Sequence, residues 1–145
     1  RGGRVTAGAD SGYMYNLYGF GYVQELELLR EAGFHPMEVI RAATLHAAEA
    51  IGMEDKIGTV ETGKFADLII MDQNPLKNLK YLYATGDIKL EGNEVIRVGG
   101  ISKTIKDGII FDARELLEDV KKIVDEEKRN TPGWENLLFE NIQRK

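Results

Sequence analysis

The spacing of apolar residues along the chain is helical in the first third and changes to short runs in the middle. Between residues 20 and 32, apolar side chains recur every three or four positions and Gly33 follows, which predicts a helix that ends there. A second helix is expected to begin at Pro36, since proline suits a first turn, and to end at Gly52. Thr44 is expected to start a fresh helical segment inside this stretch.

Short apolar runs bounded by turn residues predict strands before and after these helices. We expect strands at residues 4–9, 65–72, 94–98, 101–105 and 109–111, with further candidates at 78–84 and 88–90. Gly-Asn, Gly-Gly and Asp-Gly pairs at residues 92–93, 99–100 and 107–108 separate the last strands as hairpin turns do. Residues 11–21, rich in Gly and Tyr, are expected to form a loop.

The last part of the chain returns to helical spacing. Asp112 is expected to cap a helix over residues 112–129, with Glu115 completing a capping box. Its apolar face is formed by Leu116, Leu117, Val120, Ile123 and Val124. A stripe of this length must be buried, either on the chain's own sheet or on another subunit. A short amphipathic piece is expected after Trp134.

Composition narrows the class of protein. The 145 residues are 43% hydrophobic and 30% charged with a net charge of -5, as in a globular domain, and the interspersed charges argue against a nucleic-acid partner. No apolar run approaches the roughly 20 residues of a membrane span. A soluble, cytoplasmic protein is therefore expected, although the residues leave the compartment undecided. Because the first residue is Arg1 rather than methionine, we expect an internal start.

Asp10 is the candidate catalytic residue. It lies where the predicted strand 4–9 gives way to a Ser- and Gly-containing loop, and a carboxylate there can ligate a metal or accept a proton from water. The alternative is a structural Asx-turn or helix cap. Of the two histidines, His46 is interpreted as a helix-packing or capping partner, and a self-contained hydrolase built from His35, His46 and nearby acids is the least favoured arrangement.

Two other groups of residues suggest chemistry at first sight. Asp67 and Asp72 flank an apolar strand, but a spacing of five places them on opposite faces, so we interpret both as structural. An aromatic run follows Asp10, and it is either the wall of a substrate pocket or a packing surface. It consists of Tyr13, Tyr15, Tyr18, Phe20 and Tyr22.

Three blocks of the sequence, in this order, resemble the C-terminal third of the metal-dependent amidohydrolase superfamily. Residues 8–10 read Gly-Ala-Asp where the family usually has Gly-Thr-Asp, residues 41–48 contain Arg-Ala-Ala-Thr and Ala-Ala, and residues 63–67 read Gly-Lys-Phe-Ala-Asp. The resemblance covers residues 4–111 and implies an α+β fold. It assigns residues 1–55 to the last unit of a (β/α)₈ barrel, 56–111 to the C-terminal part of a β-sandwich and 112–145 to a helical extension.

The resemblance also implies a function. Asp10 would contact a divalent metal, expected to be zinc, and act as general base and then general acid in hydrolysis of C–N bonds in small amides, dipeptides or cyclic amides. The branch most similar contains imidazolonepropionases and Xaa-Pro or Xaa-Arg dipeptidases. The family's other metal ligands would lie upstream, so we expect this chain alone to be inactive and to bind no metal tightly.

The same resemblance leaves the partners of the chain open. They would be a small-molecule substrate in the complete enzyme and either the missing N-terminal barrel portion or a second copy. The alternative function is a non-catalytic assembly or interaction module that kept the fold, since a lone last barrel strand has unpaired edges.

Overall fold

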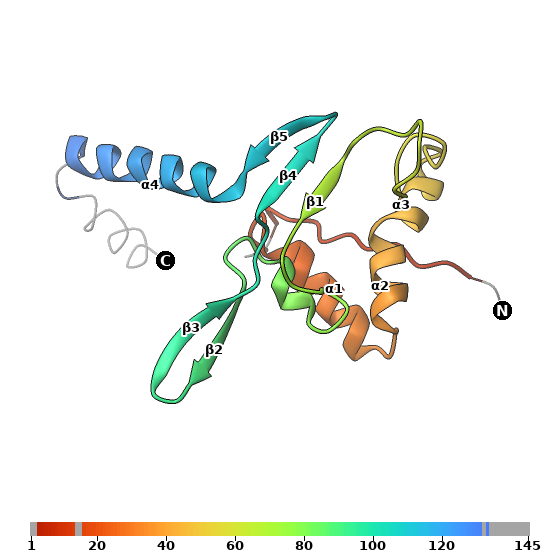
Figure 1. The fold of residues 1–145 in the computed structure, drawn as a ribbon, viewed down its shortest axis with the longest axis horizontal. Helices are drawn as coiled ribbons and strands as arrows, with labels where there is room; N and C mark the ends of the chain where they lie inside the picture. Colours follow the sequence, from red (N-terminus) through yellow and green to blue (C-terminus); the bar gives the residue numbers. More distant parts are fainter. Residues whose placement is uncertain (1–2, 14–15, 132, 134–145) are drawn as a thin grey trace. The chain divides into compact units, whose positions relative to one another are not determined.

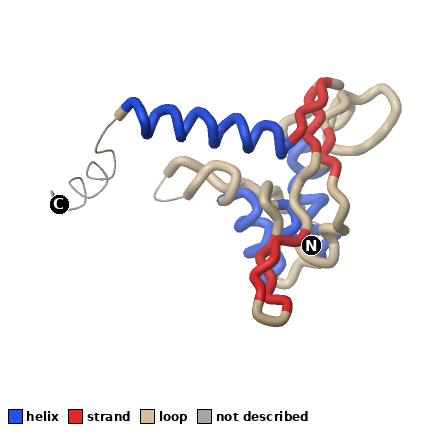
Figure 2. The backbone as a smooth tube through the Cα atoms, turned by 60° about the vertical axis from the view of Figure 1, so that its left-hand side comes forward, coloured by secondary structure: helices blue, strands red, loops and turns tan. Residues whose placement is uncertain are grey.

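The computed structural model describes residues 3–13, 16–131 and 133, which form two units, Arg1–Phe111 and Asp112–Lys145. Helices α1–α3 come first in the chain, the strands follow, and helix α4 comes after them (Figure 1). Figure 2 distinguishes the helices from the strands by colour. The elements are α1 (Gly21–Glu31), α2 (Pro36–Ala43), α3 (Leu45–Ala50), β1 (Leu68–Ile70), the 3₁₀ helix η1 (Leu79–Leu82), β2 (Asp87–Glu91), β3 (Glu94–Val98), β4 (Lys103–Lys106), β5 (Ile109–Asp112) and α4 (Ala113–Asn130). None of the described helices is long and apolar enough to cross a membrane.

The helices agree with the predictions from apolar spacing. Gly33 follows α1 with a φ of 101°, and α2 begins at Pro36 after His35, whose backbone N donates to Glu38 Oε2 at 2.7 Å. A new helical segment does begin after Thr44, but the threonine hydroxyl does not cap it. Instead it donates to Ile40 O at 2.7 Å, one turn back.

Two of the strand predictions were wrong. Residues 4–9 form no strand in the described chain, because no described strand lies beside them to share a ladder of hydrogen bonds. Residues 78–84 form the 3₁₀ helix η1, because the Asn78 side chain accepts a hydrogen bond from Lys80 N at 3.0 Å and starts a helical turn. A third strand, predicted over 65–72, is shortened to β1.

The strands form two separate antiparallel sheets. One has the order β1-β4-β5, with Leu68 opposite Ile105, and the other is the β2–β3 hairpin, which extends away from the helices in Figure 1. The predicted turns at residues 92–93 and 107–108 are confirmed; Asp107 and Gly108 have φ of 49° and 80°, as a type I′ turn requires. The Gly-Gly pair at 99–100 is no hairpin turn, since it connects one sheet to the other.

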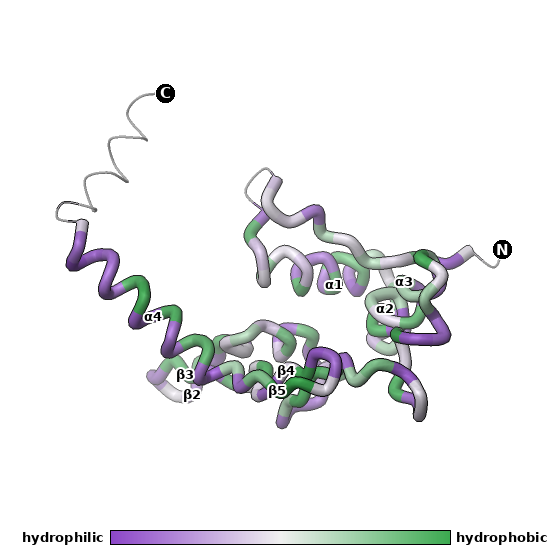
Figure 3. The backbone as a smooth tube through the Cα atoms, turned by 90° about the horizontal axis from the view of Figure 1, so that it is seen from above, coloured by the Kyte–Doolittle hydropathy of each residue, from purple (hydrophilic) through white to green (hydrophobic). Residues whose placement is uncertain are grey.

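The core of the first unit lies between the helices and η1. Its buried centre is Leu26, Val39 and Leu79, with Val39 0% exposed. The strands contribute little to it: Ile69, Ile110 and other apolar side chains of the three-stranded sheet are about half exposed. Figure 3 shows both hydrophobic and hydrophilic stretches of the chain around the β4 and β5 labels. Among the described residues, therefore, the helical layer is packed while the sheet keeps uncovered apolar surface.

The second unit is described as the single helix α4. Asp112 caps it as predicted, with its Oδ1 accepting from Arg114 N at 2.9 Å and from Glu115 N at 3.2 Å. The apolar stripe predicted for this helix is exposed in every member. The amphipathic piece expected after Trp134 lies outside the described residues.

Candidate functional site

Asp10 lies at the end of the N-terminal segment with a left-handed backbone, at a φ of 46°. Aspartate tolerates this region better than most residues, but a non-glycine residue there is uncommon and often found at functional sites. The side chain is exposed, and it has no hydrogen-bond or ion-pair partner among the described residues. Neither an Asx-turn nor a helix cap is formed by it, because the N-cap of the next helix, α1, is Phe20.

The segment that leads to Asp10 is held against α2 and α3. Ala7 N donates to Ala42 O at 3.2 Å, and His46 Nδ1 lies 3.3 Å from Val5 O. His46 thus makes a packing contact of the kind expected of it. The contact links α3 to the backbone five residues before the candidate carboxylate.

Asn16 closes the loop that follows Asp10. Its Nδ2 donates to Ala9 O, its backbone O accepts from Gly12 N at 2.7 Å, and its backbone N donates to Tyr13 O at 3.1 Å. Sequence reasoning missed this residue, because a single asparagine in a Gly- and Tyr-rich loop belongs to no motif. Asn16 is thus bonded to Ala9, which precedes Asp10, and to Gly12, which lies two residues after it.

The described members of the aromatic run after Asp10 are all exposed, from Tyr22 at 39% to Tyr18 at 79%, and two of them make specific contacts. Phe20 lies with its ring centroid 5.8 Å from that of Tyr83, and Tyr22 OH donates to Ala43 O at 3.1 Å. Burial raises the pKa of Tyr22. Tyr15 lies outside the described residues. Tyr22 also lines a large hollow in this unit.

The larger hollow, which we call the apolar groove, has a volume of about 780 Å³. It is lined from α1–α3 by Tyr22, Val23, Leu26, Ile40, Ala43, Ala47, Ala48 and Ile51, and from residues 57–101 by Ile57, Val60, Phe65, Leu68, Ile69, Met71, Leu82 and Ile101, among others. Asp10 is not among the lining residues. Asp67 also lines the groove, but its carboxylate is bound by Lys106 and by the backbone N of Asp107, and the rest of the lining is mainly apolar.

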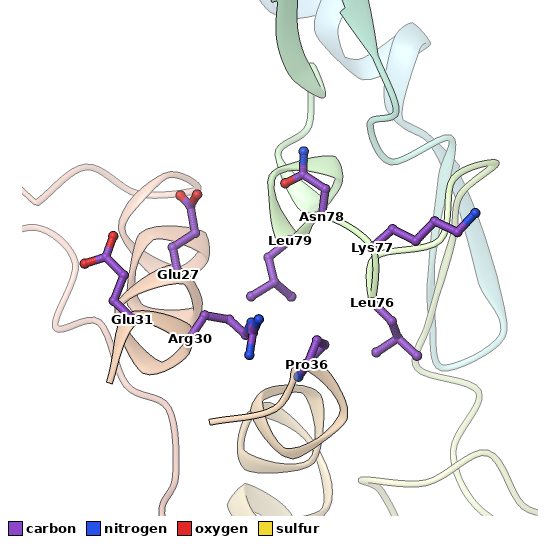
Figure 4. Close-up of a pocket in the computed structure, with 8 residues that line it drawn as sticks. All are labelled: Glu27, Arg30, Glu31, Pro36, Leu76, Lys77, Asn78 and Leu79. Carbon is purple, nitrogen blue, oxygen red and sulfur yellow. The ribbon is translucent and has the colours of Figure 1, made fainter. Parts of the chain in front are cut away.

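A smaller hollow of about 250 Å³ lies between α1, the start of α2 and residues 76–79 (Figure 4). Glu27 and Arg30 border it, but both make structural contacts: Glu27 Oε2 accepts from Tyr83 OH at 3.0 Å, and Arg30 donates to Phe34 O. Burial, and then the hydrogen bond from the hydroxyl to Glu27, raise the pKa of Tyr83 to about 12. Glu27 and Arg30 are therefore engaged in holding the fold.

The acids singled out in the sequence do not assemble into a metal site. Among the described residues, no three His, Cys, Asp or Glu side chains are grouped so that they could hold an ion, whereas a zinc enzyme usually supplies about three ligands. Asp67 is structural, as predicted: it accepts from Lys106 Nζ at 2.5 Å and from Asp107 N at 2.8 Å. The Lys106 hydrogen bond, and then that from Asp107, lower the pKa of Asp67. Asp10 by itself does not fit a bound metal.

Known proteins are similar in sequence to the first unit, Arg1–Phe111. The model of the amidohydrolase family matches residues 1–111. An imidazolonepropionase of Caldanaerobacter subterraneus is 34% identical over 108 residues, covering 68% of this chain and 25% of the relative; one of Shouchella clausii is 38% identical over 68 residues, covering 46% and 15%. The chain thus spans a quarter or less of the length of these relatives.

Among solved structures, a protein of Bifidobacterium longum described as a candidate prolidase matches with a TM-score of 0.58 and 28% identity. The match covers 79% of this chain and 26% of that protein.

Proposed function

The chain belongs to the amidohydrolase family, and on this premise we propose that it is the C-terminal part of a hydrolase that cleaves C–N bonds in small amides, dipeptides or cyclic amides. The names of its relatives support this reaction class, since an imidazolonepropionase and a prolidase both hydrolyse C–N bonds. In this proposal residues 1–55 correspond to the last β/α unit of a barrel, and residues 56–111 to the C-terminal part of a β-sandwich.

Asp10 is the residue that carries the chemistry in this proposal. Its carboxylate is exposed and has no partner among the described residues, so it is free to accept a proton from the attacking water. The same proton then passes to the nitrogen of the leaving group when the C–N bond breaks. General acid–base catalysis of this kind contributes about 10²–10⁴-fold to rate.

The metal of the complete enzyme would be held mainly by residues outside this chain. A divalent ion such as zinc supplies Lewis acidity when bound, and Asp10 would offer it one carboxylate. Because the described residues do not make a site on their own, we propose that the 145-residue chain is inactive alone. It would gain its site by joining the N-terminal portion of the barrel.

The alternative function, an assembly or interaction module, is favoured by a different observation. The apolar groove and the uncovered side chains of the three-stranded sheet are surfaces that soluble proteins usually cover. Among the described strands, β1 pairs with β4 alone, and its other side is an edge where another strand can add. In this case the chain binds a second copy or a partner and catalyses nothing.

The experiment is a hydrolysis assay on the complete polypeptide that contains this segment. The substrates are Xaa-Pro and Xaa-Arg dipeptides and a cyclic amide, each with added zinc and after chelation. We expect turnover of at least one class, its loss on chelation and its return with zinc, while the 145-residue chain stays inactive. No turnover of any substrate by the folded, metal-loaded polypeptide contradicts the proposal, and so does zinc-dependent turnover by the short chain.

A further inference from the structure

We propose that Asn16, held in place by Gly21, is the positioning residue that sets where the Asp10 carboxylate lies. The inference rests on the proposed role of Asp10 and adds to it a residue that no motif contains. It depends on three features of the loop over residues 9–21: the bonds of Asn16, the space left by Gly21 and the lack of other support for Asp10.

The first feature is that Asn16 binds the backbone on both sides of Asp10. On the N-terminal side its Nδ2 donates to Ala9 O, the carbonyl that is joined directly to the amide nitrogen of Asp10. On the C-terminal side its backbone O accepts from Gly12 N at 2.7 Å, a main-chain bond that is held in place only as long as residue 16 keeps its position. The two residues that border Asp10-Ser11 are therefore both tied to one asparagine.

The second feature is the fit between Asn16 and the first residue of α1. Gly21 is buried, and a Cβ atom there would lie 1.6 Å from Asn16 Oδ1, 2.6 Å from its Cγ and 3.0 Å from Ser11 Oγ. Any side chain at position 21 must therefore push the Asn16 amide away. Gly21 itself is fixed by its N–H, which donates to Leu17 O at 2.9 Å.

The third feature is that the Asp10 side chain has no support of its own. Its carboxylate has no partner among the described residues, and its φ of 46° lies in the left-handed region, which is uncommon for a side-chain-bearing residue although aspartate tolerates it better than most. The position of the carboxylate therefore follows from the backbone, and the backbone here follows from Asn16. Since a misplacement of about 1 Å can cost about 10²-fold in rate, loss of the side-chain bond from Asn16 Nδ2 to Ala9 O should reach the chemistry.

The test uses the complete, zinc-loaded enzyme with the variants Asn16→Ala and Gly21→Ala. We expect either variant to lower kcat by about 10- to 100-fold, with KM within about twofold and bound zinc unchanged. The double variant should resemble the single ones, because both changes break the same linkage. A multiplicative loss in the double variant would contradict this shared linkage.

Asn78→Ala is the matched control. Asn78 also braces a turn of this unit with its side chain, donating to Asp87 Oδ2 at 2.8 Å and accepting from Lys80 N at 3.0 Å. We expect it to lower the melting temperature as much as Asn16→Ala while leaving kcat within about twofold. A loss of kcat that tracks the melting temperature in all three variants would reduce Asn16 to a structural residue and overturn the inference.

The variant Asp10→Asn separates this inference from the proposed function. If Asp10→Asn is inactive while Asn16→Ala and Gly21→Ala keep kcat, the positioning role is refuted and the role of Asp10 stands. If Asp10→Asn is fully active, the proposed role of Asp10 fails, and the positioning role fails with it.

Discussion

Replacement of Gly58 by alanine tests how the loop over residues 57–60 packs on α3. Gly58 has a φ of 92°, and a Cβ atom there would lie 2.7 Å from Ala48 Cβ, 3.2 Å from Leu45 Cα and 3.2 Å from Thr44 O. Two of these atoms belong to the backbone and the third to a side chain only 2% exposed. None of them can rotate away, so the loop or the helix must shift.

The expected cost is the sum of two terms. A left-handed backbone costs an alanine about 1–2 kcal/mol, and overpacking against a rigid neighbour costs about 1–3 kcal/mol. Gly58→Ala should therefore lower the free energy of unfolding by about 2–5 kcal/mol. Gly63→Ala is the matched control: Gly63 has a φ of 94° with nothing within 4 Å, so only the backbone term of about 1–2 kcal/mol applies.

The assay is urea unfolding of the 145-residue chain, followed by circular dichroism. The urea midpoints of the two variants can be compared directly if both variants keep the m-value of the unaltered chain, which is the slope of the unfolding free energy against urea concentration. We expect the urea midpoint of Gly58→Ala to lie clearly below that of Gly63→Ala. Equal midpoints would refute the reasoning, because they would mean that the loop is not packed on α3 as described.

Three further predictions concern the same unit. The pKa of Asp67 is lowered chiefly by its hydrogen bond from Lys106, so the stability that this carboxylate contributes is fully present well above pH 3.8 and is lost as the pH falls through the lower folded-state pKa. Asp67→Asn should therefore reduce the fall in melting temperature at acid pH. A fall identical to that of the unaltered chain would contradict this prediction. Val39→Ala should cost about 2–4 kcal/mol in urea unfolding, since its side chain is wholly buried, and a cost below about 1 kcal/mol would contradict the placement of the core. His46→Ala should cost about 0.5–1.5 kcal/mol by removing the bond to Val5 O, and amide exchange in residues 5–9 should quicken; unchanged exchange would contradict the contact.

The parts of the fold that the sequence predicts well are those decided by neighbours along the chain. The helical spacing of apolar residues, followed by Gly33, correctly predicted α1. The capping side chain of Asp112 correctly predicted where α4 begins. The Asp107-Gly108 pair predicts its turn because both residues accept a positive φ. In each case the contacts that decide the structure lie within about four residues.

The predictions from sequence were wrong where the local structure depends on residues that are distant in the sequence. Residues 4–9 have strand-like composition, but a strand needs a neighbour to pair with. The Gly-Gly pair at 99–100 looks like a turn, yet a Cβ atom at Gly99 would lie 2.7 Å from the ring of Tyr81, which shows a close approach that the sequence does not reveal. The contact between Asn16 and Gly21 was missed for the same reason. Asp10 was named from its place after an apolar run, and its role stays a prediction.

The central claim is that the Asp10 carboxylate moves a proton during hydrolysis. The most direct measurement is kcat of Asp10→Asn in the complete, zinc-loaded enzyme, with the bound zinc of each preparation determined. We predict a fall in kcat of about 10²–10⁴-fold at unchanged folding. A variant that turns over substrate at the rate of the unaltered enzyme would contradict the account.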